Sequence, residues 1–135
     1  MIDKEIIKIA SNTENHGVLN NHTHFSRLKN SICGDEIKVY LIIQDNKILD
    51  FKYECESCIY CQASVSLLSK NAKNKSIEKV KKFTEQAINI FEKNVQSFDK
   101  EWKEFNKIIK KNNISRKECV LLPFKTVAKA LNYKL

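Results

Sequence analysis

A pair of apolar segments joined by a turn constrains the fold of this chain more than any other feature. In residues 37–43, apolar side chains return at every second position, which is the period of a strand with one buried face. Asp45 and Asn46 come next, and both residue types favour a tight turn. Residues 48–53 are again rich in apolar and aromatic side chains and continue as a second strand. We therefore expect an antiparallel hairpin, with residues 24–30 as a candidate third strand.

Helices are predicted on both sides of this hairpin from the three-to-four residue spacing of apolar side chains. A short helix is expected over residues 3–10, and a second helix directly after Cys58. Apolar side chains then follow the same spacing through residues 77–109. This stretch is either one long helix or two helices that break near residues 97–99.

The C-terminal part is predicted to form a last helix that begins near Leu122, because Pro123 suits the first turn of a helix. The chain thus runs from a short helix through a small antiparallel sheet to further helices. This order predicts an α+β fold in two layers, with a sheet of about three strands covered on one side by helices. At 135 residues, the chain is expected to be a single domain over residues 1–135.

The composition argues against several classes of protein. The net charge is +8, but lysines dominate this excess and are interspersed with acids in the C-terminal half, as on solvated helix faces. They are accompanied by no recognition motif and no arginine stripe interleaved with aromatics, so we expect no nucleic-acid partner. No apolar run approaches the roughly 20 residues of a membrane helix, and the N-terminus does not resemble a signal peptide. The prediction is a cytoplasmic protein that does not bind membranes.

Five cysteines point to metal or sulfur chemistry, because disulfides are disfavoured in the cytoplasm. Cys33 and Asp35 flank Gly34 at the start of the first hairpin strand, where a tight turn lets a thiol and a carboxylate face the same side. The alternative for this pair is a buried cysteine beside a turn aspartate. Cys58 lies where a strand passes into a helix, and Cys119 lies just before the last predicted helix. A helix N-terminus favours a thiolate, which metal binding and nucleophilic sulfur chemistry both require.

The remaining cysteines and two histidines are more ambiguous. Cys55, Cys58 and Cys61 form a C-x2-C-x2-C run, a spacing found in the cluster loops of bacterial ferredoxins. The fourth cysteine followed by proline is missing here, so a ferredoxin-type loop is not expected. A structural role is favoured for Cys61, and Cys55 is either a buried hydrophobe or an accessory thiol. His22 and His24 have the spacing of metal ligands on a strand, but a polar loop or an exposed strand face is favoured for them.

Three motifs resemble, in the same order, those of the NifU/IscU/SufU family of iron-sulfur cluster assembly scaffolds. They are the Cys-Gly-Asp sequence within residues 30–37, the segment 53–66 in which an aromatic residue precedes a cysteine and an Ala-Ser-x-Ser helix start, and Arg116 with Cys119 three residues later. The stretch between Cys58 and Cys119 is long, which resembles the SufU branch and not the IscU branch, and the chain as a whole is similar to a SufU-type or a divergent NifU-like member. Glu118 stands where the IscU branch has a histidine, and the chaperone-recognition segment of that branch is absent.

The resemblance implies a site and a set of partners. It implies a SufE/NifU-like two-layer domain in which Cys33, Asp35, Cys58 and Cys119 converge at one end of the sheet. These residues are then the ligands of a transient [2Fe-2S] cluster or of Zn2+, since three thiolates and one carboxylate suit either metal. Cys119 resembles the family cysteine that accepts persulfide sulfur from a cysteine desulfurase, and Arg116 is a candidate for orienting it. Apo iron-sulfur proteins are the other implied partners, and the chain itself is expected to be a monomer or a weak homo-oligomer.

Three functions remain open on the sequence alone. The favoured one is a scaffold, without enzymatic activity, that assembles a [2Fe-2S] cluster from iron and persulfide-derived sulfur and passes it to apo-proteins. The alternative is an enzyme, a zinc-dependent sulfurtransferase that accepts persulfide from a cysteine desulfurase, and the long insert and the missing histidine agree with it. A second alternative is a zinc-stabilised interaction domain, although structural zinc sites use cysteine and histidine more often than aspartate.

Overall fold

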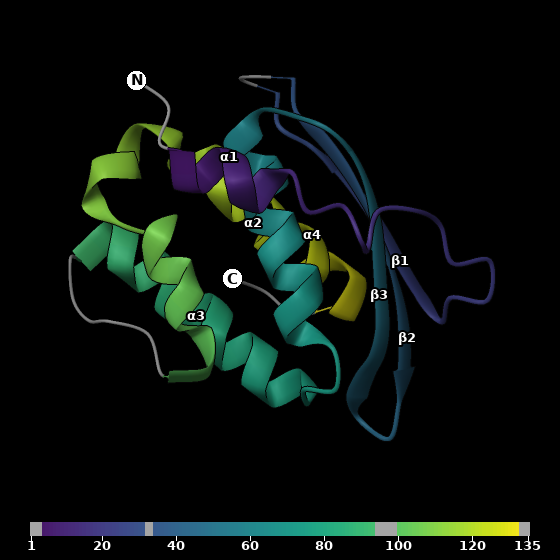
Figure 1. Cartoon of the computed structure of the whole chain (residues 1–135). Coiled ribbons are helices and arrows are strands. Elements are labelled where there is room, and N and C mark those ends of the chain that lie inside the picture. Colours follow the sequence, from purple (N-terminus) through teal and green to yellow (C-terminus); the bar gives the residue numbers. More distant parts are fainter. Residues whose placement is uncertain (1–3, 32–33, 94–99, 133–135) are drawn as a thin grey trace.

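The computed structural model describes residues 4–31, 34–93 and 100–132 (Figure 1). Its elements in chain order are α1 (Lys4–Ala10), β1 (His24–Lys29), β2 (Glu36–Gln44), β3 (Lys47–Glu56), α2 (Ile59–Ala72), α3 (Ile77–Lys93), η1 (Lys100–Lys107), η2 (Lys111–Arg116) and α4 (Lys117–Leu131). η1 and η2 are 3-10 helices. In this described part of the chain, no helix combines the length and the apolar character needed to cross a membrane.

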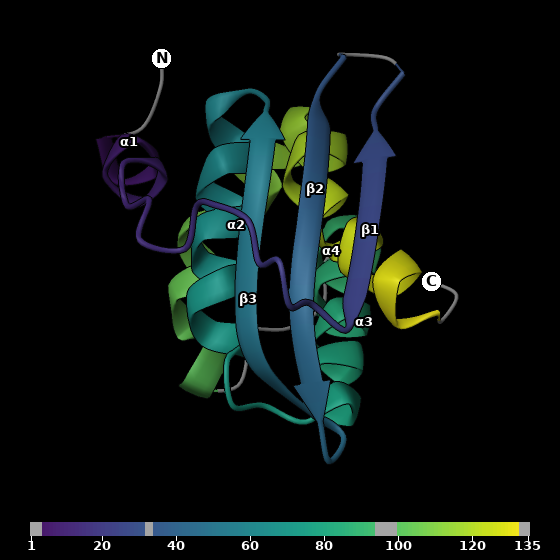
Figure 2. The ribbon, with the colours of Figure 1, turned by 90° about the vertical axis from the view of Figure 1, so that its right-hand side faces the viewer.

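The three strands form one antiparallel sheet in the order β1-β2-β3, and the helices lie on one of its faces (Figures 1 and 2). The predicted hairpin is confirmed as β2 and β3, in which Val39 lies opposite Tyr53. The candidate third strand is confirmed as β1, whose Ser26 pairs with Val39. At the edge of β3, Gly17 donates a backbone hydrogen bond to Tyr53 at 2.8 Å, and Tyr53 donates to Asn15 at 3.2 Å. The predicted two-layer α+β fold is therefore correct.

The turn between β2 and β3 also ties the sheet to α3. Asp45 and Asn46 have positive φ angles of 51° and 64°, which is the left-handed conformation of a type I′ hairpin turn. The Asn46 side chain donates to both carboxylate oxygens of Glu78, at 2.9 and 2.7 Å. Its backbone carbonyl accepts a hydrogen bond from Ile77 at 3.0 Å. One turn residue thus holds the start of α3 against the end of the hairpin.

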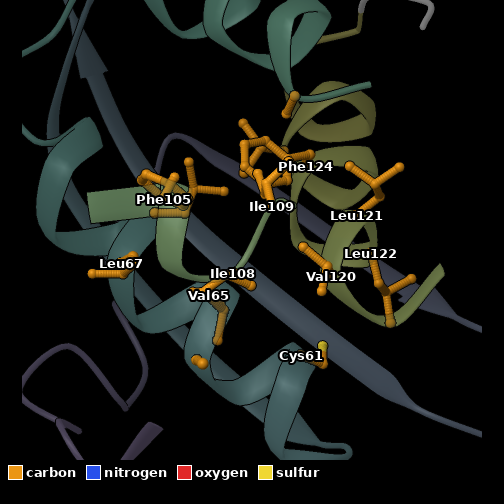
Figure 3. Packing of buried hydrophobic residues seen from close by; sticks show 14 of the residues in the cluster. Cys61, Val65, Leu67, Phe105, Ile108, Ile109, Val120, Leu121, Leu122 and Phe124 are labelled. Carbon is orange, nitrogen blue, oxygen red and sulfur yellow. The ribbon is translucent and has the colours of Figure 1, made fainter. Parts of the chain in front are cut away.

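The central helix of the helical layer is α2. Nine of its fourteen residues are buried, because it packs against β3 as well as against α1 and α4. Its small side chains, such as Ala63 and Ser64, let these neighbours approach closely. Figure 3 shows Val65 of this helix in the same buried cluster as Val120 of α4, which is distant in sequence.

Residues 77–109 form two separate elements rather than one long helix. On a single straight α-helix, Phe83 and Trp102 would lie about 28 Å apart at 1.5 Å per residue. Their rings instead stack with centroids 4.0 Å apart and planes within 3° of each other. η1 therefore folds back against α3, and it has 3-10 rather than α-helical geometry. The predicted break near residues 97–99 lies outside the described residues.

The last helix begins earlier than predicted, at Lys117 rather than near Leu122. Pro123 is consequently the seventh residue of α4 and not part of its first turn. A proline inside a helix cannot donate to the carbonyl four residues back, which here belongs to Cys119. The helix continues through this position because the residues on either side of the proline, Leu122 and Phe124, are buried in the core.

The hairpin turn provides a test of this packing. Replacing Asn46 by alanine should lower the free energy of unfolding by about 2 kcal/mol, because a left-handed alanine is strained and the bonds to Glu78 are lost. Asn46→Gly keeps the backbone conformation and loses only the side-chain bonds, so its loss should be about 1 kcal/mol. Urea unfolding at neutral pH measures both values. Equal losses in the two variants would show that the left-handed conformation does not matter for stability.

Candidate functional site

Three of the four predicted site residues meet at one end of the sheet. Asp35 stands directly before β2, Cys58 directly before α2, and Cys119 in the first turn of α4. One carboxylate oxygen of Asp35 and the two sulfur atoms lie within 4.8 Å of one another. The fourth predicted residue, Cys33, lies outside the described residues. Three segments that are far apart in the sequence thus supply one compact group of donor atoms, the donor group.

The register of the hairpin brings Asp35 close to Cys58. Glu36 and Glu56 lie opposite each other at the ends of β2 and β3. Asp35 immediately precedes the first of them, and Cys58 follows the second after one intervening residue. Cys58 has an extended backbone, with φ −69° and ψ 165°, and its carbonyl accepts the hydrogen bond of Gln62 at 3.0 Å. The Cys58 side chain therefore lies at the N-cap position of α2.

The contact between α2 and α4 brings Cys119 to the same place. The hydroxyl of Ser64 donates to the carbonyl of Val120 at 2.6 Å, and both residues are fully buried. This bond fixes the first turn of α4 against α2. Cys119, the neighbour of Val120, is 6% exposed. The prediction that Cys119 precedes the last helix is wrong, because α4 already begins at Lys117.

Asp35 gives the clearest indication that this group binds a cation. Its side chain is buried, with the residue 6% exposed, and its Oδ1 accepts a hydrogen bond from the backbone N–H of Cys58 at 3.2 Å. Its Oδ2 is buried and has no hydrogen-bond partner among the described residues. A buried carboxylate oxygen without a partner is costly, and a bound cation would remove that cost. Because thiolates and a carboxylate suit zinc and iron, the residues present fit either metal.

The amino-acid sequence places the chain in a known family. Residues 1–105 match the NifU-like N terminal domain. This chain belongs to the NifU-like N-terminal domain family. The match ends before Cys119, so the position of the third donor comes from the structure and not from the family match.

Two curated relatives of this NifU-like chain carry different functional names. Over 134 residues it is 31% identical to the iron-sulfur cluster assembly scaffold protein IscU of Thermotoga maritima. The matched region covers 97% of this chain and 92% of the relative. Over 67 residues it is 34% identical to the zinc-dependent sulfurtransferase SufU of Bacillus subtilis. This matched region covers 50% of this chain and 45% of that relative. The similarity to the scaffold protein thus extends over nearly the whole chain.

Two solved structures have the same architecture. A putative iron-sulfur cluster assembly scaffold protein for the SUF system from Fervidobacterium islandicum superposes with a TM-score of 0.86 at 28% identity, over 96% of both chains. The N-terminal part of a nitrogen-fixing NifU-like protein from Brucella abortus superposes with a TM-score of 0.89 at 22% identity, over 96% of this chain and 91% of that one. The second likeness concerns the fold alone.

The other described thiols of this NifU-like chain have different surroundings. Cys61 is fully buried in the core, and burial raises the pKa of its thiol. This is the position of a structural residue. Cys55 is half-buried, and burial raises the pKa of its thiol as well. It borders two cavities of about 200 and 210 Å³, both of which also include His16. The C-x2-C-x2-C run is therefore divided among three environments and does not surround one site.

His22 and His24 are engaged in local contacts and do not belong to the donor group. Nδ1 of His22 lies 2.7 Å from the carbonyl of Leu19, and its ring packs against Phe25. Nδ1 of His24 lies 2.8 Å from the hydroxyl of Thr23. These contacts agree with the loop and strand positions favoured for both residues.

A contact beside the site was not visible in the sequence. The guanidinium of Arg116 lies 5.4 Å from the ring centroid of Tyr60, within the distance of a cation–π interaction. Arg116 is the exposed N-cap residue of α4, three residues before Cys119, and Tyr60 lies in the first turn of α2, two residues after Cys58. The pair connects the two helix starts that carry the thiols. The aromatic residue after Cys58 was the one available sequence signal.

The buried Cys61 thiol predicts how stability changes at alkaline pH. An unfolded cysteine ionises near its ordinary pKa of 9.0, whereas folded Cys61 keeps its proton to higher pH because burial raises its pKa. Its contribution to stability is thus complete below pH 9 and is lost as the pH rises, at up to about 1.4 kcal/mol per pH unit. Cys61→Ala should therefore be less stable at neutral pH but lose less stability between pH 8.5 and 10, measured by urea unfolding under reducing conditions.

Tyr53→Phe is the matched control for that window. Burial raises the pKa of Tyr53 to about 12, above its ordinary value of 10.0. This variant should therefore lose nearly as much stability as the normal protein up to pH 10 and differ from it mainly above that pH. An unchanged slope in Cys61→Ala between pH 8.5 and 10 would contradict the assignment to Cys61.

Proposed function

We propose that this NifU-like chain is an iron-sulfur cluster assembly scaffold. Asp35, Cys58 and Cys119, together with Cys33, would hold iron and sulfide as a transient [2Fe-2S] cluster that passes to apo-proteins. The observation that carries the proposal is the donor group itself, in which three donor atoms lie within 4.8 Å and a buried Asp35 oxygen lacks a partner among the described residues. The similarity to a protein named as a scaffold, over nearly the whole chain, supports it.

The donor types suit a cluster that is held and then released. Thiolates are the usual ligands of iron-sulfur clusters, and Cys58 and Cys119 supply two of them. Asp35 supplies a harder oxygen donor, which binds iron in a cluster less firmly than a thiolate does. A site with one such ligand is better suited to handing on its cargo than a site with four cysteines.

Cys119 is the proposed sulfur acceptor. Its thiolate would attack the outer sulfur of a persulfide on a cysteine desulfurase, forming a new S–S bond while the desulfurase cysteine leaves as a thiolate. This step needs no further oxidant or reductant. Since Cys119 is only 6% exposed, the partner has to reach it beside the exposed Arg116. The net charge of +8 favours docking of an acidic partner surface. The cysteine desulfurase and the apo-proteins as partners, and a cytoplasmic location, are part of the proposal.

A zinc-dependent sulfurtransferase is the second candidate function. The same donor types suit zinc, and Glu118 precedes Cys119 where the IscU branch has a histidine. Half of this chain is similar to a protein named as a zinc-dependent sulfurtransferase, and this similarity supports the second candidate function. In this case the chain would be an enzyme that relays persulfide sulfur. A zinc-stabilised interaction domain remains the third possibility.

Cluster assembly tests the scaffold function directly. Protein prepared without oxygen is mixed with a cysteine desulfurase, cysteine and ferrous iron, and visible absorption is recorded. A [2Fe-2S] spectrum should develop and be transferable to an apo-ferredoxin. Cys58→Ser should lower its yield by at least about tenfold, because a ligand is lost. Cys61→Ala, which removes a buried thiol outside the donor group, should assemble the cluster normally. A chromophore that forms equally well in Cys58→Ser would contradict the proposed site.

Zinc binding separates the two alternatives from the scaffold. A sulfurtransferase should be isolated with tightly bound zinc, form no chromophore, and raise desulfurase turnover, an effect that Cys119→Ser abolishes. In a structural zinc domain, removing zinc with a chelator should unfold the chain, because metal binding contributes directly to folding. Cys119→Ser should then change the unfolding temperature without affecting any desulfurase.

A further inference from the structure

The sulfur atoms of Cys58 and Cys119 lie close enough to react with each other. They are no more than 4.8 Å apart, and both residues are thiols in the structure. The proposed function uses both as ligands and Cys119 as the sulfur acceptor. A persulfide, however, carries its outer sulfur at a higher oxidation state than the sulfide of an iron-sulfur cluster. Two electrons therefore have to reach this sulfur after Cys119 has accepted it.

The fold holds the backbones of the two cysteines in place beside each other. Oδ1 of Asp35 accepts the backbone N–H of Cys58 at 3.2 Å, which fixes the start of α2. The bond of 2.6 Å from Ser64 to the carbonyl of Val120 fixes the first turn of α4, which carries Cys119. A disulfide needs its two sulfur atoms at about 2.0 Å. The Cys58 side chain is only partly buried, so it has room to turn towards Cys119 and close this distance.

Cys58 is the best placed of the described thiols to attack sulfur that is bound to Cys119. Cys61 is fully buried in the core, and Cys55 is not among the donors that lie within 4.8 Å of one another. Thiols dissolved in the surrounding water have poor access, because Cys119 is only 6% exposed. A thiol that is already held beside its target reacts faster than one that has to diffuse to it.

We infer that Cys58 is a resolving thiol that releases sulfide from the persulfide on Cys119. The inference rests on the proposed function in its scaffold form. The Cys58 thiolate attacks the inner sulfur of the persulfide, which is the Sγ atom of Cys119. A disulfide forms between Cys58 and Cys119, the bond between the inner and the outer sulfur breaks, and the outer sulfur leaves as hydrosulfide.

The step balances without an added oxidant or reductant. The outer sulfur is reduced to sulfide, and the sulfur of Cys58 is oxidised to the level of a disulfide. The leaving hydrosulfide takes up the proton that Cys58 has given up, so the products are one disulfide and one molecule of hydrogen sulfide. Hydrosulfide is a weaker base than a cysteine thiolate, and the weaker base leaves more readily.

A dithiol completes the cycle. It reduces the disulfide between Cys58 and Cys119 by thiol–disulfide exchange and is itself oxidised to a cyclic disulfide. Both cysteines are then thiols again and can serve as ligands. The release of sulfide thus precedes metal binding, because a bound cation would engage the sulfur of Cys58.

Mass spectrometry of the full chain tests this step in the absence of metal. Sulfur is loaded by a cysteine desulfurase with limiting cysteine and a chelator, and released sulfide is trapped and measured. The normal protein should release sulfide and become two hydrogen atoms lighter than its thiol form, with Cys58 and Cys119 joined in the peptide map. Cys58→Ser should keep the added sulfur on Cys119 and release sulfide at least about tenfold more slowly. Because no metal is present, the loss of a ligand cannot cause this difference.

Two controls separate the chemistry from folding and from docking. Cys61→Ala removes a buried thiol outside the donor group and should release sulfide as the normal protein does. Loading with a small-molecule persulfide donor in place of the desulfurase removes the need for docking. Cys58→Ser should retain its persulfide under this condition as well.

The outcomes distinguish the inference from the function on which it rests. A persulfide that stays on Cys119 in the normal protein, or that moves intact to Cys58, overturns the inference and leaves the acceptor role of Cys119 standing. Equal rates of sulfide release from the normal protein and from Cys58→Ser also overturn it. If Cys58→Ser gains no sulfur and the normal protein releases no sulfide, the acceptor role itself is overturned, and the inference fails with it.

Discussion

The hydrogen bond between the Ser64 hydroxyl and the Val120 carbonyl is the contact on which the site depends. It is 2.6 Å long, fully buried, and joins α2 to α4 across 56 positions of sequence. Only a small side chain at position 64 lets the two helices approach this closely. Because Cys58 begins one of these helices and Cys119 lies in the first turn of the other, the helix contact also sets the distance between the two thiols. The same contact between α2 and α4 therefore determines both the packing of the core and the geometry of the site.

Asp35 connects that helical contact to the sheet. One of its oxygens accepts the backbone N–H of Cys58 and so helps to start α2, while the other is buried without a partner in the described chain. A single carboxylate thus orders the strand-to-helix junction and leaves one oxygen for a ligand. A buried carboxylate oxygen without a partner is costly, and a bound cation would remove that cost. The same residue therefore stabilises the junction and offers the donor group one buried oxygen that could bind a cation.

The sequence predicted the hairpin and its turn because both depend on neighbouring residues. Alternating apolar side chains set the strands, and Asp45 and Asn46 tolerate the left-handed conformation that the turn requires. Predictions from local sequence signals were wrong or missing where tertiary contacts determine the course of the chain. Pro123 suggested a helix start, but burial of the residues around it carries α4 through the proline. The stacking of Trp102 on Phe83, which reverses the chain between α3 and η1, had no local signal either.

The motifs named the donor residues, but not how environment divides the chemistry among the thiols. Cys55, Cys58 and Cys61 have equal spacing in the sequence, yet one lies at a strand edge, one at a helix N-cap and one inside the core. The spacing cannot encode this difference, because it arises where β3 ends and α2 begins. Cys61 is removed from solvent and metal alike, and Cys58 joins the donor group. Cys55 lies half-buried at the strand end, borders two cavities, and has a thiol whose pKa is raised by burial.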